Sequence, residues 1–369
     1  MRVAYFGTWE RGYPRNDQVI TALEAAGVDV DLVHEEMWAG THKFGLTPTV
    51  LPRLAQAEVR LALTTVAEDA EALVVGYPGH FDLWSAKHHD RPVVFNAMVS
   101  LYDTFVEDRE RFRDGSAAAK ALRRLDRAAF RAASLVVADT QANADFMREL
   151  AGIDEVAVCY VGAEERLFRP AWRRGEDFHV LFVGKLAPLH GLELILEAAR
   201  RLPDVAFRIV GTGQMTDVLV ERPANVEHVP WVAYEQLPDL YAKAGCALGI
   251  FGSSGKAQRV IPHKAFQALA VGTPLVTADT AAAREMLVDG RDCLLVERTA
   301  EALAQAIVSV RDNAELAEKI AAGGRATFER EASEAVLGAR WREVIERAIE
   351  RRKLTRSALG DVPRHVVDG

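Results

Sequence analysis

The sequence has little cysteine, no long apolar run and no excess of positive charge. Its three cysteines, Cys159, Cys246 and Cys293, are widely spaced and flanked by apolar residues, which predicts buried thiols rather than a disulfide framework or a metal site. No apolar run approaches the roughly 18 residues of a membrane span, and the run at the start is too short for a signal peptide. Lys and Arg number 45 against 53 Asp and Glu, so the net charge of −8 argues against a nucleic-acid partner. Together these absences predict a cytoplasmic protein with reduced thiols.

The sequence does contain a regular alternation of strand-like and helix-like segments. Its 369 residues suffice for two domains, and 49% hydrophobic with 27% charged residues is ordinary for globular proteins. Strands are expected at 2–7, 28–33, 71–76, 92–96, 134–138, 156–161, 179–183, 205–210, 226–229, 246–250, 274–278 and 292–296. Helices are expected at 16–26, 51–68, 117–133, 140–151, 191–201, 235–243, 263–271, 299–311 and 314–329. The alternation predicts an α/β protein of two facing, Rossmann-like doubly wound domains, with a ligand in the crevice at the carboxyl ends of the strands.

One segment interrupts the alternation and another closes the chain. The polar stretch 168–175 contains Pro and Gly and lies between the two halves, so we interpret it as a linker. The expected domains are therefore 1–168 and 169–332. The last segment, 333–369, is expected to contain a long amphipathic helix at 333–352 and a frayed tail after Leu359.

Glycines and cations gather where strands of the second half end. Glycine permits close approach of a ligand to the backbone, and a helix N-terminus flanked by cations favours an anion such as phosphate. The residues at these positions are Gly184, Lys185, His190, Gly211, Gly213, Lys256, Arg259, Pro262 and Lys264. A solvated basic loop explains any one of these groups, whereas a ligand that carries a diphosphate explains all of them.

Four segments of the chain resemble the retaining glycosyltransferases of the GT-B fold, in particular family 4 (glycosyl transferases group 1). These are FVGKLAPLHGLELILEAARRL at 182–202, IVGTGQ at 209–214, IPHKAFQALAVGTPLVTAD at 261–279 and VGAEERLFRP at 161–170. The resemblance implies an acceptor-side first domain, a second domain that binds a nucleoside-diphosphate sugar such as a UDP or GDP sugar, and a C-terminal helix that crosses back to the first domain. It further implies transfer with retention of configuration, with no metal and no cofactor.

The resemblance also assigns residues to the donor. Lys185 and His190 stand where the family contacts the diphosphate, and Lys185 and Lys264 would stabilise the departing diphosphate as catalytic groups. Arg259 and Gln267 stand at the two positions of the family's Glu-x7-Glu pair, so that pair is absent here. The full set of expected donor-binding residues is Gly184, Lys185, His190, Gly211, Gly213, Trp231, Val232, Arg259, Pro262, Lys264, Gln267 and Glu285.

The first half supplies the expected acceptor side. Gly7, Thr8 and Arg15 belong to the connection between the first strand and the first helix, where Arg15 is a candidate anion contact and a plain surface loop is the alternative. His80 and Asp103 follow the third and fourth strands and are candidate catalytic residues. A helix cap is the alternative role for Asp103.

Two questions stay open in the sequence. One interpretation of the basic stretch 109–131 is a weak contact with an anionic membrane surface or with an anionic acceptor. The other is a solvated helix face, which the interspersed acidic residues favour. The acceptor itself is unspecified and is a sugar, a lipid-linked glycan or a natural product. The alternatives to a transferase are a sugar-nucleotide epimerase or hydrolase on the same fold, and a non-catalytic protein that binds sugar nucleotides.

Overall fold

Short apolar runs rich in β-branched residues form two parallel six-stranded sheets in a computed structural model that describes residues 1–38 and 50–358. The first sheet contains β1 (Arg2–Gly7), β2 (Asp29–His34), β3 (Ala70–Val75), β4 (Val93–Asn96), β5 (Leu135–Ala138) and β6 (Val156–Val158), in the order β2-β1-β3-β4-β5-β6. The second contains β7 (His179–Val183), β8 (Ala206–Val210), β9 (Val226–Val229), β10 (Cys246–Leu248), β11 (Leu275–Ala278) and β12 (Leu294–Val296), in the order β12-β11-β10-β7-β8-β9. Each expected strand is confirmed, with small shifts of its ends.

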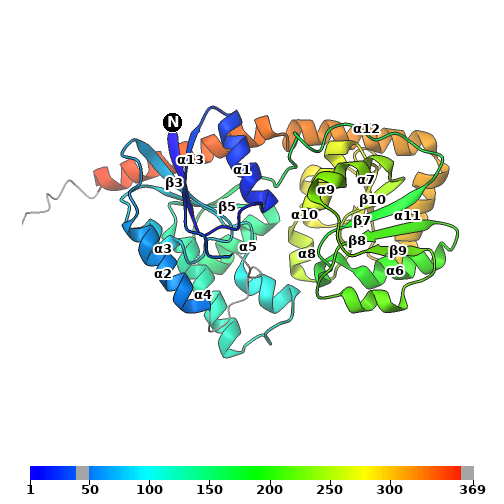
Figure 1. Cartoon of the computed structure of the whole chain (residues 1–369), viewed down its shortest axis with the longest axis horizontal. Coiled ribbons are helices and arrows are strands. Elements are labelled where there is room, and N and C mark those ends of the chain that lie inside the picture. Colours follow the sequence, from blue (N-terminus) through cyan, green and yellow to red (C-terminus); the bar gives the residue numbers. More distant parts are fainter. Residues whose placement is uncertain (39–49, 359–369) are drawn as a thin grey trace, which may run out of the picture.

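Helices connect the strands and cover both sheets (Figure 1). The first unit, built on the first sheet, has α1 (Pro14–Ala25), α2 (Val50–Leu63), α3 (Leu83–Ala86), the π-helix η1 (Asp103–Asp108), α4 (Ala117–Ala132) and α5 (Gln141–Ala151). The second unit has η2 (Pro188–His190), α6 (Leu192–Arg201), η3 (Thr216–Glu221), η4 (Tyr234–Gln236), α7 (Leu237–Lys243), α8 (Gly255–Arg259), α9 (His263–Val271), α10 (Ala281–Met286), α11 (Ala300–Asp312) and α12 (Ala314–Glu331). The short elements α3, α8, α10 and η1–η3 were not expected from periodicity, because one or two turns leave no repeated apolar pattern, whereas η4 and α7 together cover the helix expected at 235–243.

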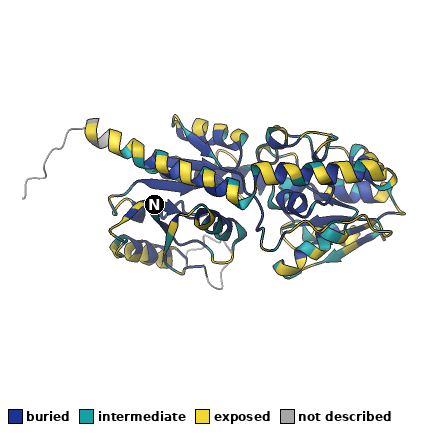
Figure 2. Ribbon diagram, turned by 90° about the horizontal axis from the view of Figure 1, so that it is seen from above, coloured by how far each residue is buried: buried dark blue, intermediate teal, exposed yellow. Residues whose placement is uncertain are grey.

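The last helix, α13 (Glu334–Ala358), crosses back onto the first unit (Figures 1 and 2). Its apolar stripe includes Leu337, Trp341 and Ile345, which are buried in the same core cluster as residues of α1. Gly338 lets the helices approach closely, since a Cβ atom there would lie 2.1 Å from a carbonyl oxygen of α1. The crossing helix predicted from the resemblance is thus confirmed, while the tail after Leu359 lies outside the described residues.

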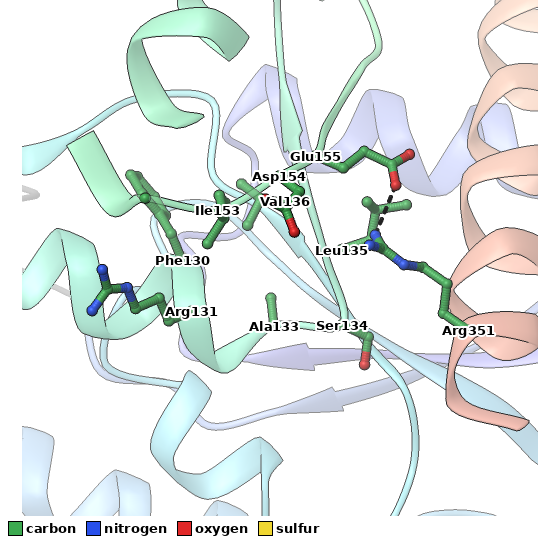
Figure 3. A pocket seen from close by; sticks show the side chains of 11 residues that line it. Phe130, Arg131, Ala133, Ser134, Leu135, Val136, Ile153, Asp154, Glu155 and Arg351 are labelled. Carbon is green, nitrogen blue, oxygen red and sulfur yellow. Dashed lines mark ion pairs between the residues drawn. The ribbon is translucent and has the colours of Figure 1, made fainter. Parts of the chain in front are cut away.

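Ion pairs fasten the far end of α13 to the edge of the first sheet. The carboxylate of Glu155 pairs with Arg347 and, at 2.8 Å, with Arg351. Figure 3 shows this second pair at a cavity of about 260 Å³. None of the residues predicted for the functional site lines this cavity, and we interpret it as part of the helix attachment.

The chain passes between the two units twice. The coil after β6 leads into the second unit, and the junction of α12 and α13 leads back. The two crossings are tied together, because the backbone N–H of Glu165 donates to the carboxylate of Glu334, and the N–H of Glu334 donates to the carboxylate of Glu165, each at 2.9 Å. The domain limits at 168 and 332 stay a prediction at the level of single residues.

The three cysteines are buried free thiols, as predicted. Burial raises the pKa of Cys159 to about 12, so it is protonated at neutral pH. In the described ranges 1–38 and 50–358, no helix has both the length and the apolar character that a membrane span needs.

Candidate functional site

A cavity of about 510 Å³ lies between the two units, where the carboxyl ends of both sheets face each other. The first unit contributes side chains that include Glu10, Tyr13, Tyr77, Met98, Arg109 and Asp139. The second unit contributes Gly184, Lys185, His190, Lys256, Pro262, Lys264 and Gln267, among others. Six of the residues predicted for the donor site therefore meet in one cavity: Gly184, Lys185, His190, Pro262, Lys264 and Gln267.

Lys264 is the most unusual side chain of this cavity. It is buried near the start of α9, and its ammonium nitrogen Nζ has no hydrogen-bond partner among the described residues. Nζ lies 3.6 Å from the centre of the Phe182 ring, and burial holds the pKa of Lys264 well below its usual value. A buried ammonium without a counter-ion is unfavourable, so this position favours an anionic ligand.

The loop after β7 brings two more groups to Lys264. Gly184 has φ +152°, a backbone conformation that favours glycine, and a Cβ atom there would lie 2.9 Å from Nζ of Lys264. Burial and the charge of Lys264 hold the pKa of His190 well below its usual value. Nδ1 of His190 accepts the backbone N–H of Ala187 at 3.4 Å, which leaves the proton of the neutral ring on Nε2. His190 is thus a neutral hydrogen-bond donor rather than a second buried cation.

Lys185 lies on the same loop, at the mouth of the cavity. Desolvation and the neighbouring charge of Arg109 lower the pKa of Lys185. No carboxylate acts on either Lys185 or Lys264 in a way that raises its pKa. Within residues 1–38 and 50–358, these two cations of the second unit therefore have no acidic group that raises their pKa.

Gly211 and Gly213 support this loop from behind and do not line the cavity. A Cβ atom on Gly211, where φ is +125°, would lie 2.0 Å from the carbonyl oxygen of Gly184. A Cβ atom on Gly213 would lie 2.5 Å from the carbonyl oxygen of Leu186. The structure therefore gives these two glycines a packing role beneath the predicted donor loop.

Gln267 and Pro262 lie on the cavity wall formed by α9. The side-chain oxygen of Gln267 accepts the hydroxyl of Tyr241 at 3.1 Å, and its amide nitrogen donates to the hydroxyl of Tyr234 at 3.5 Å. This network fixes the orientation of the amide. Pro262 is the N-cap of α9 and so precedes its first turn.

Three expected donor residues lie elsewhere. Trp231 is 77% exposed, and neither it nor Val232 lines the cavity. The carboxylate of Glu285 accepts the backbone N–H groups of Gln141 and Ala142 at 2.6 and 2.7 Å, so it closes the N-terminus of α5 in the other unit. The structure thus gives Glu285 a contact between the units outside the cavity described above, and its role toward the donor stays a prediction.

Arg259 and Asp103, one predicted for each side of the reaction, bind each other instead. The guanidinium of Arg259 donates to Asp103 at 2.5 Å and to Glu107 at 3.0 Å, and neither Arg259 nor Asp103 lines the cavity. Burial raises the pKa of Asp103 to about 6, although Lys256 and Arg259 oppose the shift. Arg259 is therefore occupied by carboxylates of η1.

The expected acceptor-side residues are structural. Gly7 has φ +130°, and a Cβ atom there would lie 2.1 Å from a carboxylate oxygen of Asp82. That carboxylate accepts both the backbone N–H and the hydroxyl of Thr8, at 2.8 and 2.9 Å. These bonds fix the end of β1, and neither residue lines the cavity.

Arg15 and His80 are buried inside the first unit, away from the cavity. Arg15 donates to Asn96 at 3.1 Å and to the carbonyl of Tyr160 at 2.9 Å, so its guanidinium is engaged inside the first unit. Nε2 of His80 lies 3.2 Å from the buried carboxylate of Asp126. A sequence shows that such a residue is polar, but it does not show which distant group will satisfy it inside the fold.

The sequence did not identify the polar residues that the first unit contributes. Asp139 directly follows β5, and burial raises its pKa to about 6 while Asn143 donates to it at 2.6 Å. Tyr13 and Tyr77 stack with ring centres 5.3 Å apart. The position of Asp139 after a strand is a signal that could have found it, whereas the two tyrosines carry no such signal.

The basic stretch 109–131 is largely engaged within the protein. Arg127 and Arg131 donate to the carbonyls of Leu150 and Ala151 at the end of α5, at 2.7 and 2.6 Å. Arg123 lies over the ring of Tyr102, 4.3 Å from its centre. These contacts lie within the first unit, most of the other basic residues of the stretch are solvent-exposed as expected for a solvated helix face, and a membrane contact stays a prediction.

Comparison with known proteins locates the resemblance in the second unit. A family model described as "Glycosyl transferase-like" matches residues 187–352. The chain is 25% identical to D-inositol 3-phosphate glycosyltransferase of Paenarthrobacter aurescens (strain TC1) over 190 residues. This aligned region covers 45% of this chain and 45% of that protein. It is 33% identical over 108 residues to the putative colanic acid biosynthesis glycosyl transferase WcaI of Escherichia coli (strain K12), which is 27% of this chain and 26% of that protein. The chain thus spans less than half the length of these curated relatives.

Solved structures match nearly the whole chain. Sucrose-phosphate synthase from Thermosynechococcus elongatus has a TM-score of 0.72 at 16% identity, over 97% of this chain and 99% of that chain. Anabaena Alr3699/HepE in complex with UDP-glucose has a TM-score of 0.69 at 17% identity, over 94% of this chain and 100% of that chain. At these identities the likeness shows the shared two-domain α/β architecture.

Proposed function

Given that the chain has the GT-B fold and a second unit with a glycosyl transferase-like domain, we propose that it transfers a sugar from a nucleoside-diphosphate donor to an acceptor hydroxyl. The observation that carries the proposal is the buried ammonium of Lys264, which has no partner among the described residues and faces the cavity. The same cavity is lined by Lys185, by His190 with its ring N–H, and by Gly184. A diphosphate supplies the negative charge that this arrangement favours.

In the proposed reaction, the bond between the anomeric carbon and the β-phosphate oxygen breaks, and a bond from that carbon to the acceptor oxygen forms. The acceptor proton passes to an oxygen of the departing diphosphate, on the same face of the sugar, so that configuration is retained. Negative charge develops on the diphosphate, where Lys185 and Lys264 would stabilise it. These two cations provide the charge that a metal ion provides in other transferases, so we propose a reaction that needs neither metal nor cofactor.

UDP is the nucleotide we propose first, because HepE, a structural neighbour, binds UDP-glucose. The acceptor would lie against the first unit, beside the stacked rings of Tyr13 and Tyr77 and the carboxyl group of Asp139. Stacked rings and a carboxylate suit a hydroxylated acceptor such as a sugar, a lipid-linked glycan or a natural product. We place the reaction in the cytoplasm, and cell fractionation tests that location.

Calorimetric titration with UDP, GDP and ADP is the first test of the proposal. Binding of one of them is expected, and absence of binding by all three would refute the assignment. Incubation with the matching sugar nucleotide and pools of acceptors, followed by mass spectrometry with and without EDTA, then tests transfer and metal dependence. A glycosylated product supports a transferase. An altered or hydrolysed donor without a product indicates an epimerase or a hydrolase, and binding without turnover indicates a non-catalytic protein.

A further inference from the structure

Arg109 belongs to the first unit but lines the cavity together with cations of the second. It directly follows η1, and it shares the cavity wall with Lys185, Lys256 and Lys264. Its Nε is buried and has no hydrogen-bond partner among residues 1–38 and 50–358. Its backbone carbonyl accepts the side-chain amide of Gln214 from the second unit at 3.1 Å. Arg109 is therefore held at the second unit while part of its guanidinium lacks a partner.

The charges around Arg109 are unbalanced on one side. Asp103, Asp108 and Asp139 act on Lys256 and compensate its charge. The positive charge of Arg109 contributes to lowering the pKa of Lys185 and that of His190. Asp108 also lies near Arg109, and Glu10 and Asp139 line the same cavity, but none of these carboxylates is among the groups that shift the pKa of Lys185 or Lys264. Like charges held together in this way favour a ligand with more than one negative charge.

Three hydrogen bonds from Arg259 and Lys256, which we call the clamp, hold η1 against α8 of the second unit and so fix where Arg109 lies. Arg259 binds Asp103 at 2.5 Å and Glu107 at 3.0 Å, and Nζ of Lys256 donates to the hydroxyl of Thr104 at 2.7 Å. The clamp ends two residues before Arg109. A π-helix such as η1 is rare and is frequently found at functional sites.

We propose that Arg109 binds the donor diphosphate from the first unit, and that Arg259 is the positioning residue that holds η1 in place for this contact. The inference rests on the proposed function. It means that the diphosphate is bound by both units at once, with Lys185 and Lys264 on one side and Arg109 on the other. The donor site is then complete only while η1 and α8 remain clamped together.

Titration with UDP and with uridine tests the role of Arg109. Because a hydrogen bond to a charged group contributes roughly 1.5–3 kcal/mol, Arg109→Ala should weaken UDP binding about 10- to 100-fold. Uridine, which lacks phosphate, should bind the variant and the wild type equally. Arg109→Lys should restore part of the loss, and Arg113→Ala, at an exposed position four residues on, should have no effect. Unchanged UDP affinity, or an equal loss for uridine, would overturn the proposal, and it would assign Arg109 to an anionic acceptor or to structure.

A double-mutant cycle tests the role of Arg259. Arg259→Met should weaken UDP binding, and Glu107→Gln, a milder change to the same clamp, should weaken it less. If Arg259 acts through Arg109, the double variant Arg259→Met/Arg109→Ala should bind UDP no more weakly than Arg109→Ala alone. Losses that add would overturn the positioning role. Thermal unfolding checks that each variant is folded, and Glu107→Gln serves as the test if Arg259→Met is not.

The result for the wild type separates the two claims. A wild type that binds none of UDP, GDP and ADP overturns both the proposed function and this inference. A wild type that binds UDP, beside an Arg109→Ala variant that binds it equally well, overturns only the inference.

Discussion

Replacing Lys264 by methionine is expected to stabilise the ligand-free protein and to weaken diphosphate binding. Nζ of Lys264 is buried without a hydrogen-bond partner among the described residues, and such a group costs roughly 1–3 kcal/mol. Methionine keeps an unbranched side chain of similar length against the ring of Phe182. The free energy of unfolding without ligand should therefore rise by about 1–3 kcal/mol, as measured by chemical denaturation.

The same substitution should weaken UDP binding about 10- to 100-fold, the value of one charge-assisted contact. Uridine binding should change little, because uridine brings no phosphate to Lys264. Isothermal titration measures both affinities. The combination of higher stability and lower affinity is the signature of a buried charge kept for binding.

The pH dependence gives an independent check. The pKa of Lys264 is lowered by burial, so the folded protein binds fewer protons there than the unfolded chain. Stability of the ligand-free wild type should thus rise with pH up to the ordinary lysine pKa of 10.5, and this contribution should vanish in Lys264→Met. A bound diphosphate raises the pKa again. Wild-type binding should therefore take up more protons than variant binding, which titration in buffers of different ionisation enthalpy detects.

Lys243→Met is a matched control, since Lys243 is exposed at the end of α7. It should change neither stability nor UDP affinity appreciably. The reasoning about Lys264 is refuted if Lys264→Met destabilises the protein while UDP affinity stays at the wild-type level. That result would make Lys264 a packing residue with a satisfied charge.

Three further substitutions test the structural contacts. The pKa of Asp139 is raised to about 6, so its carboxyl group lowers the free energy of unfolding increasingly as pH rises from about 4 to 6. Asp139→Asn should remove this pH dependence and raise the free energy of unfolding at pH 7 by up to about 3 kcal/mol. Chemical denaturation at a series of pH values measures both effects. Arg15→Met should destabilise the protein by about 3 kcal/mol, because buried oxygens including the Tyr160 carbonyl lose their donor, without changing UDP affinity in titration. Glu285→Gln should cost about 1 kcal/mol at the N-terminus of α5 in thermal unfolding, and a loss of UDP affinity there would return Glu285 to the donor site.

The sequence was sufficient to predict the architecture. Apolar runs such as Leu73–Val75 can be recognised as strands in the sequence, because a strand covered on both faces needs apolar side chains throughout. The GT-B fold that the resemblance implied is confirmed, and so is the likeness of the second unit to glycosyl transferases. Gly184 and Lys185 directly follow β7, Lys264 lies in the first turn of α9, and all three line one cavity at the carboxyl ends of the strands.

Contacts between distant parts of the chain were not predictable. Arg259 appeared to be a free cation because its partners, Asp103 and Glu107, lie about 150 residues earlier on a π-helix that leaves no periodic signal. Arg15 appeared to be an anion contact for the same reason, since its partner carbonyl lies 145 residues away. Arg109 was seen only as part of a basic stretch, because its position in the cavity depends on how the two units face each other.

The reciprocal bonds between Glu165 and Glu334 restrict the relative degrees of freedom of the two halves of the molecule. A single connecting segment would allow rotation about any axis, whereas two adjacent crossings permit bending about the line that joins them and resist torsion. Sliding one half over the other would shear both bonds at once, while bending leaves them intact. Separation of the two units at η1 and α8 would in addition require the hydrogen bonds made by Arg259 and Lys256 to break.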